Sequence, residues 1–219
     1  MERILLYGAT GRTGKLVLKY ALEQGYEVTA LARNPDKINL KSDRLKIIKG
    51  SPEDPEDVRS AIQDCKVVIS TLSAFAESEV LSLKKVQTRN TLEKAISNSI
   101  ISMKEQHIKK IISLSSIGAG SSYKYAPWYM KLMIKISNFK FVFADHNAQE
   151  RLLMNSGLDW IIVRPVALND KTEIKDWAVT YNNTPSPFKI SRNTVAKFII
   201  DSVQSNEFVY KAPILSEKK

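Results

Sequence analysis

Three glycines near the start of the chain follow directly on an apolar run and constrain the fold more than any other feature. The run, residues 3–7, predicts a buried strand, and the residues from 14 onward predict a helix. Glycine suits such a turn because a side chain would collide with the helix behind it or with a pyrophosphate in front of it. The unpaired N–H groups of the first helical turn then face the anion. The turn therefore predicts a dinucleotide site that includes Gly8, Thr10, Gly11, Arg12, Thr13 and Gly14.

Further apolar runs recur along the chain, with helical patterns between most of them. The predicted strands are residues 27–31, 45–48, 67–71, 111–114 and 160–163, and the predicted helices are residues 14–24, 55–62, 80–105, 194–204 and parts of 129–156. This alternation indicates a Rossmann-like α/β fold, a doubly wound parallel sheet with helices on both faces. We expect a short last strand at residues 208–210 and loops beside the active-site cleft at residues 169–189.

Length and composition favour one domain. The chain has 219 residues and no linker-like stretch, so we expect a single domain over residues 1–219, with a substrate cleft from about residues 115–190. No stretch approaches ~20 consecutive apolar residues, and a first strand at residue 3 leaves no room for a secretory signal. The lone Cys65 has the character of a small packing residue. We therefore expect a cytoplasmic protein without a membrane partner.

The net charge of +10 raises the question of an acidic partner. The lysines are dispersed, and no zinc-ligand spacing, recognition-helix pattern or aromatic-basic repeat accompanies them. A solvated basic surface is thus favoured over a nucleic-acid groove. A phosphate-rich cofactor accounts for part of the excess positive charge.

The residue at the end of the second predicted strand indicates which dinucleotide is bound. NAD sites usually place a carboxylate there, about 20 residues after the glycines, to bind the ribose hydroxyls. This chain has Arg33 instead, and the guanidinium group matches the oxygens of a 2′-phosphate, with Arg12 approaching from the glycine turn. NADP is therefore predicted over NAD. The alternative is that Arg33 is a solvated loop cation.

Several motifs together resemble a known family: residues 8–14 (GATGRTG), 113–119 (SLSSIGA), and 156–160 (SGLDW) leading to Arg164-Pro165. From about residue 2 to about residue 200, the chain resembles atypical short-chain dehydrogenases/reductases of the NAD(P)-binding, NmrA-like group, and is similar to flavin reductase/biliverdin-IXβ reductase. The resemblance implies NADP along the sheet edge and a nicotinamide facing a small apolar pocket. It also implies that the phosphates are bound by Arg12 and Thr13, and that the cofactor is flanked by Thr71, Leu72, Ser73 and Pro165.

The chain also departs from these relatives. None of its eight tyrosines has a lysine four residues later, although the wider superfamily uses a Tyr-x-x-x-Lys pair for proton transfer. Ser51 stands where the family often has an aspartate near the adenine, and we keep it as a candidate contact. Residues 166–168 (Val-Ala-Leu) replace a histidine of flavin-reducing relatives. These losses put flavin or biliverdin reduction in doubt.

The candidate catalytic residues are Ser116, Ser115 and His146. The two serines follow the fifth strand and can polarise a bound carbonyl, or they serve only as turn hydrogen bonds. His146 shares a helix face with Glu150, whose carboxylate can orient the imidazole; the alternative is a surface pair. Aromatic and methionine residues are expected to form the pocket wall, unless they are core or a subunit face: Tyr123, Tyr125, Pro127, Trp128, Tyr129, Met130, Met133 and residues 141–143. Trp177 and Tyr181 are lid candidates.

Three functions fit these patterns. The first is an NADP-dependent reductase that transfers hydride to a small planar acceptor such as a quinone, a flavin or a conjugated carbonyl. The second is a non-catalytic NADP-binding regulator that senses the redox state of the cofactor and passes it to a partner protein. The third, a nucleotide-sugar epimerase, is disfavoured by the missing Tyr-Lys pair and the short chain. A small-molecule substrate, and a homodimer or a regulatory protein partner, are the expected partners.

Overall fold

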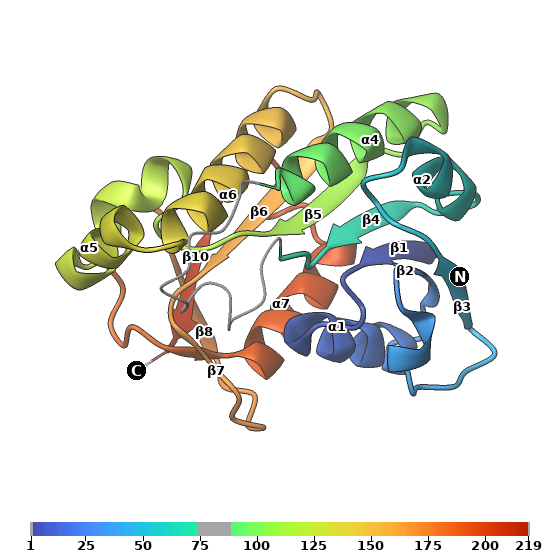
Figure 1. Cartoon of the computed structure of the whole chain (residues 1–219). Coiled ribbons are helices and arrows are strands. Elements are labelled where there is room, and N and C mark those ends of the chain that lie inside the picture. The colour runs from blue at the N-terminus through green and yellow to red at the C-terminus, as the bar shows by residue number, and fades with distance from the viewer. Residues whose placement is uncertain (1, 74–88, 219) are drawn as a thin grey trace.

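The computed structural model describes residues 2–73 and 89–218, and its main feature is an eight-stranded sheet (Figure 1). The strand order is β3-β2-β1-β4-β5-β6-β10-β8, and every neighbouring pair is parallel except β10 with β8. The strands are β1 (Arg3–Tyr7), β2 (Glu27–Ala32), β3 (Leu45–Lys49), β4 (Val67–Ser70), β5 (Lys110–Leu114), β6 (Asp159–Pro165), β8 (Trp177–Thr180) and β10 (Ile214–Glu217). A short parallel pair, β7 (Leu168–Asn169) and β9 (Ile190–Ser191), lies apart from this sheet.

Helices cover both faces of the sheet, as Figure 1 shows. On one face α1 (Arg12–Glu23) packs on α7 (Arg192–Gln204); on the other, α4 (Thr91–Glu105) packs between α2 (Pro55–Ala61) and α6 (Phe139–Met154). The shorter α5 (Trp128–Ile136) packs on α6 at one end of the molecule, after the 3-10 turn η2 (Gly120–Tyr125); a second such turn, η1 (Pro35–Lys37), follows β2. The predicted Rossmann-like doubly wound fold is confirmed.

Burial on both faces explains why the inner strands are largely apolar. Along β1, Ile4 and Leu6 enter the core beneath α1 and α7, while Leu5 and Tyr7 enter the core beneath α2, α4 and α6. Successive side chains of a strand point to opposite faces, so both sets must be apolar when helices cover both.

Two of the predicted elements are wrong. Residues 208–210 form a turn in which Tyr210 has φ 59°, and the last strand is β10. The segment at residues 169–189 is largely irregular, as expected, but it contains β8, which pairs antiparallel with β10 at the sheet edge. Of the helix expected at residues 80–105, the structure shows α4, and residues 80–88 lie outside the described residues.

The start of α4 is held by α6. Asn90, at the N-cap position, provides no side-chain cap; instead the Asp145 carboxylate accepts hydrogen bonds from the backbone N–H groups of Leu92 (3.0 Å) and Glu93 (3.1 Å). A carboxylate stabilises a helix N-terminus because it satisfies unpaired N–H groups and complements the helix dipole. This contact fixes α6, and hence the residues it presents to the sheet edge, relative to α4.

Candidate functional site

The glycine turn lies at the switch point of the sheet, where the chain leaves β1 beside the end of β4. Gly8 has φ +80°, and a Cβ on it would lie 2.7 Å from the carbonyl oxygen of Thr71. A Cβ on Gly14 would lie only 1.9 Å from the carbonyl oxygen of Gly8, so α1 packs on the turn with no room for a side chain. Gly11, the N-cap residue of α1, offers no side-chain cap. A helix N-terminus such as this one favours an anionic ligand through its N–H groups and its dipole.

A cleft of about 440 Å³ opens at this turn and extends to α5 and α6. It is lined by most of the predicted cofactor residues, namely Gly8, Thr10, Gly11, Arg12, Thr13, Arg33, Thr71, Leu72, Ser73 and Pro165, and by all three candidate catalytic residues, Ser115, Ser116 and His146. Gly14 lies behind the turn as a packing contact. Ser51 does not line the cleft: its N–H donates to Asp57 Oδ2 (2.8 Å), and the neighbouring Pro52 lines the wall instead.

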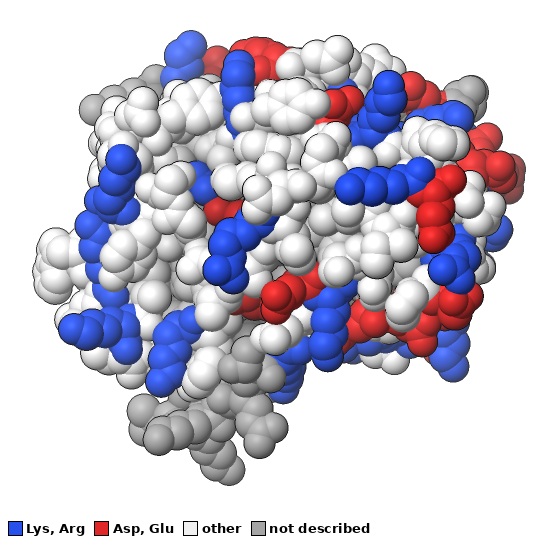
Figure 2. Space-filling view, turned by 90° about the horizontal axis from the view of Figure 1, so that it is seen from above, with Lys and Arg blue, Asp and Glu red and all other residues white. Residues whose placement is uncertain are grey.

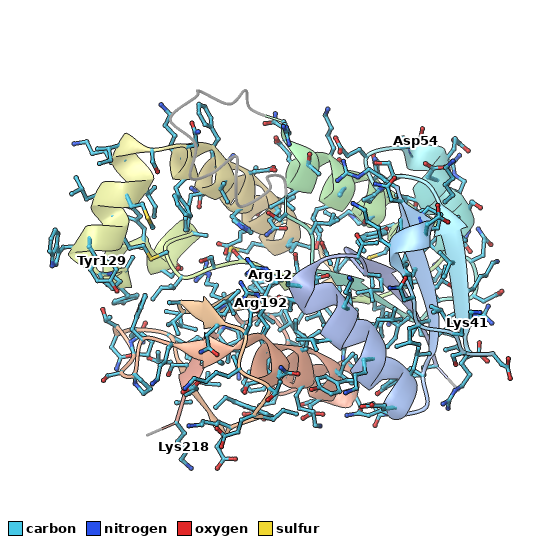
Figure 3. All side chains as sticks on the ribbon, turned by 60° about the horizontal axis from the view of Figure 1, so that its bottom comes forward. Arg12, Lys41, Asp54, Tyr129, Arg192 and Lys218 are labelled. Carbon is cyan, nitrogen blue, oxygen red and sulfur yellow. The ribbon has the colours of Figure 1, made fainter. Side chains whose placement is uncertain are left out.

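One end of the cleft is basic. Arg12, at the start of α1, and Arg192, at the start of α7, lie close together in the middle of the molecule (Figure 3). The Asp170 carboxylate joins them, accepting from Arg192 Nη1 (2.6 Å) and lying 3.4 Å from Arg12 Nη1. The Arg192 side chain is 11% exposed, whereas that of Asp170 is 63% exposed. The sequence analysis missed Arg192 and Asp170. Ser191 could have indicated Arg192, because its hydroxyl caps α7 and so marks Arg192 as the first residue of a helix.

The other end of the cleft is apolar. Met130 of α5 and Phe139, Val142 and Phe143 of α6 form its wall. The prediction was right for Met130 and for two of residues 141–143, but the other predicted wall residues do not line the cleft: Tyr123, Tyr125, Pro127, Trp128, Tyr129, Met133 and Phe141. Trp128 and Tyr129 are instead exposed on α5. Phe143 and Met130 also pack with Ala119 and Ile134, so the same cluster is both core and pocket wall. The two lid candidates, Trp177 and Tyr181, do not line the cleft. Trp177 lies on β8 and packs edge-on against Phe198, with ring centroids 5.6 Å apart.

The carboxylate of Glu150 does not orient His146, contrary to the expected pair. Glu150 accepts hydrogen bonds from Arg164 Nε (2.9 Å) and Nη2 (2.6 Å) and from the Ser115 hydroxyl (2.7 Å). The Glu150 and Arg164 side chains are 2% and 4% exposed. A buried carboxylate needs such complete pairing, and here it also fixes Ser115 beneath the cleft. The Ser116 hydroxyl donates to the carbonyl oxygen of Ile117 (3.1 Å).

The partner of His146 is Gln149. The Gln149 amide nitrogen faces the carbonyl oxygen of Leu114 (3.1 Å), which only an N–H donor can do, and it lies 2.9 Å from His146 Nδ1. Nδ1 therefore accepts, and the ring proton is on Nε2. Burial lowers the pKa of His146, and the opposing effects of Glu150 and Asp145 are smaller. The cleft is thus lined by a neutral imidazole with one N–H donor.

A Rossmann-like sheet with a glycine turn at its switch point defines a dinucleotide-binding domain. The chain belongs to the NAD(P)H-binding family, which it matches over residues 8–206. No helix in residues 2–73 and 89–218 combines the length and apolar character that crossing a membrane requires.

Relatives by sequence include a chloroplastic protein and a photosystem II assembly factor. The chloroplastic protein At2g34460 of Arabidopsis thaliana is 24% identical over 96% of this chain and 75% of its own length. Photosystem II assembly factor Ycf39 of Synechocystis sp. is 26% identical over 99% of this chain, which spans 63% of Ycf39.

Solved structures share the fold. The anaerobillin reductase ChuY of Escherichia coli O157:H7 superposes with a TM-score of 0.79 at 21% identity, covering 99% of this chain and 98% of ChuY. A short-chain dehydrogenase/reductase of Veillonella parvula, solved in complex with NADP, gives a TM-score of 0.77 at 18% identity, covering 99% of this chain and 94% of that one.

Proposed function

We propose that this chain is an NADP-dependent oxidoreductase that transfers hydride from NADPH to a small planar acceptor such as a quinone, a flavin or a conjugated carbonyl. One observation carries the proposal: a single cleft joins the glycine turn and its arginines to an apolar wall of α5 and α6 residues. A dinucleotide that binds its phosphates at the turn extends its reactive end toward that wall. Hydride transfer needs such a water-poor recess more than it needs acid or base groups.

NADP is proposed over NAD because of the charges at the end of β2. Arg33 is exposed at the mouth of the cleft, directly after β2, where NAD sites usually hold a carboxylate. Arg12 lies on the same cleft, at the start of α1. Two guanidinium groups suit a doubly charged 2′-phosphate, which NAD lacks.

The chain offers the Nε2–H of His146 as a donor near the acceptor, and the Ser116 hydroxyl becomes a second donor when it turns away from the carbonyl oxygen of Ile117. NADPH supplies the hydride when it is bound. A neutral imidazole polarises a carbonyl oxygen through a hydrogen bond, as in other enzymes with a histidine of lowered pKa. The bond from Ser115 to Glu150 makes that serine a positioning residue, which keeps the end of β5 in place. The reduced acceptor takes its proton from water or from the Ser116 hydroxyl.

The test is NADPH oxidation, followed by the loss of nicotinamide absorbance, with a panel of quinones, flavins and conjugated carbonyls. We expect turnover with at least one acceptor. Arg33→Ala is expected to weaken NADPH binding by ~1.5–3 kcal/mol and to leave NADH binding nearly unchanged. Lys41→Ala, a change of an exposed cation in the loop before β3, is the matched control and leaves both affinities unchanged. Equal losses for both cofactors in Arg33→Ala would refute the NADP assignment.

The second candidate is a non-catalytic NADP-binding regulator. It is favoured by the absence of a Tyr-x-x-x-Lys pair from the sequence and by the hydrogen bond from the Ser115 hydroxyl to Glu150, which occupies a candidate catalytic group. Selective NADPH binding without turnover of any acceptor in the panel would support this candidate and refute the reductase.

A further inference from the structure

The outward face of α5 is an exposed apolar stripe. Trp128, Leu132 and Ile136 are spaced four residues apart, so they share one side of this nine-residue helix. Trp128 is 76% exposed and Ile136 is 72% exposed, with Leu132 at 48% and Tyr129 at 51%. The inward face is different, because Ile134 is buried there and Met130 lines the cleft. Apolar side chains of this size are rarely grouped on a surface that meets only water.

Among the residues that the structure describes, the charges around this stripe are positive. From residue 106 to residue 144 the sequence contains no aspartate or glutamate. The same region carries four lysines on η2, α5 and the start of α6, namely Lys124, Lys131, Lys135 and Lys140. In Figure 2 blue side chains lie among white ones at the left edge, the end where α5 lies, and red side chains gather toward the opposite end.

Within residues 2–73 and 89–218, neighbouring elements add no exposed carboxylate. The segment at residues 181–188 contacts α5 through Phe188, whose ring packs edge-on against that of Tyr129 with the ring centroids 6.4 Å apart. This segment contains no acidic residue. The two carboxylates of α6, Asp145 and Glu150, are 3% and 2% exposed, and both are hydrogen-bonded inside the molecule. The surface formed by the stripe and the four lysines, hereafter the α5 surface, therefore combines apolar side chains with uncompensated positive charge.

We propose that the α5 surface binds the surface of an anionic lipid bilayer. Tryptophan and tyrosine prefer the headgroup level of a bilayer, and leucine and isoleucine enter the adjoining acyl boundary. Lysine side chains reach from the same helix to the lipid phosphates, which attract them. The helix lies on the membrane in this arrangement and does not cross it.

A second copy of the chain fits this surface less well. In a symmetric dimer the same patch meets itself, so the four lysines of one copy face those of the other without a carboxylate between them. An acidic protein satisfies the lysines, but it offers no special partner for an exposed tryptophan with flanking aliphatic residues, which a headgroup region does. The lipid surface satisfies both features at once.

Docking on α5 also affects the cleft, a consequence that rests on the proposed function. Met130 lines the cleft from the opposite side of the same helix, so a bilayer beneath α5 lies next to the apolar end of the cleft. An acceptor dissolved in the membrane, such as a quinone, then has a short path to the site.

The experiment is co-sedimentation of the full chain with vesicles of phosphatidylcholine alone and of phosphatidylcholine with about one third phosphatidylserine. We expect binding to the anionic vesicles that weakens as salt rises. Trp128→Ser combined with Ile136→Ser is expected to reduce the partition coefficient about tenfold or more. Lys135→Glu combined with Lys140→Glu is expected to reduce it at least about twentyfold, because each lysine contributes roughly a fivefold gain. None of these results depends on NADPH or turnover, so they are separable from the proposed function.

Matched controls change the same chemistry elsewhere. Lys41→Glu combined with Lys46→Glu alters the net charge by the same amount at the β3 end of the molecule, far from Tyr129 of α5 (Figure 3). Ile101→Ser removes a 53% exposed apolar side chain from α4. Both controls retain vesicle binding if the proposal is right. Absence of binding, or an equal loss in the controls, overturns it, and retention on a polyglutamate peptide without vesicle binding assigns the surface to an acidic protein instead.

Discussion

Replacing Glu150 with glutamine tests how the floor of the cleft is held together. The substitution keeps the shape of the side chain but removes its charge and turns one of its two oxygens into a donor. Glu150 accepts three hydrogen bonds, from two nitrogens of Arg164 and from the Ser115 hydroxyl, so at least one N–H of the new amide faces another donor. Arg164, whose side chain is 4% exposed, keeps the remaining amide oxygen and the Ser121 hydroxyl (3.1 Å) as acceptors, but it loses the carboxylate charge that compensates its own.

The expected loss is large for a domain of this size. Leaving one partner of a buried ion pair uncompensated costs about 3–5 kcal/mol, out of about 5–15 kcal/mol for the stability of a typical domain. The free energy of unfolding is measured by urea denaturation followed by circular dichroism, with the slope checked for two-state behaviour. Removing both charges, with Glu150→Leu and Arg164→Met together, is expected to restore stability to within about 1–2 kcal/mol of the parent, because apolar residues need no pairing.

The control is Glu56→Gln, which breaks the exposed pair with Arg59 (2.5 Å) at the surface of α2. Water and ions screen this pair, so the urea midpoint is expected to change little. A cost of less than about 1 kcal/mol for Glu150→Gln, or a double variant that is less stable than the single one, would show that the pair does not hold the cleft floor in this way.

Three further predictions concern single residues. Burial raises the pKa of the Cys65 thiol to about 11, so at pH 8 about 0.1% is thiolate and a disulfide reagent labels it only after denaturation; rapid labelling of the folded chain contradicts this. Burial lowers the pKa of His146 below 6.5. As the pH falls from about 6.5, the unfolded chain therefore gains a proton that the folded chain does not, and the free energy of unfolding decreases as the pH decreases. Urea midpoints compared across pH are expected to show a smaller decrease in His146→Asn. Gly14→Ala places a Cβ 1.9 Å from a carbonyl oxygen, so it is expected to lower the free energy of unfolding by ~1–3 kcal/mol or more and to abolish cofactor binding in a fluorescence titration. Gly11→Ala, whose Cβ has its nearest atom at 3.3 Å, is expected to retain stability and cofactor binding better than Gly14→Ala.

The sequence predicted the strands of the cofactor half well, for a physical reason. The predicted runs at residues 3–7, 27–31 and 67–71 agree within one residue with β1, β2 and β4. Each of these strands is buried on both faces, so it is largely apolar and its ends are marked by a change of composition. The glycine turn was equally visible, because its steric demands fall on consecutive residues of one short segment.

The last strands escaped prediction because their burial depends on distant partners. β10 contains Ser216 and Glu217, which are 1% and 4% exposed but polar, so no apolar run marks them. Its antiparallel partner, β8, lies in a segment without periodicity. Residues 208–210 have the apolar character of a strand, but Phe208 packs on Phe198 of α7, with ring centroids 4.9 Å apart, within a turn.

Side-chain pairing across the site escaped for the same reason. Helical spacing correctly placed His146 and Glu150 one turn apart on α6, yet spacing does not reveal that Arg164 on β6 reaches Glu150. Because Glu150 is paired with Arg164, the hydrogen-bond partner of His146 is Gln149 instead. A local rule therefore gives the position of Glu150 on its helix, while its hydrogen-bond partner Arg164 comes from another element.

The two ends of the cleft are thus built in different ways. The phosphate end uses backbone groups and short-range turns, which few sequences satisfy and which are therefore easy to find. The acceptor end uses side chains of α5 and α6, brought to the sheet edge by helix packing and by the Glu150–Arg164 pair. Any apolar side chain of suitable volume fills such a wall, so its residues carry little signature in sequence although they decide which planar molecule fits. The NAD(P)H-binding class of the chain follows from the glycine turn at residues 8–14 and its surroundings. The acceptor of the proposed reaction has to be found by experiment on the residues of α5 and α6.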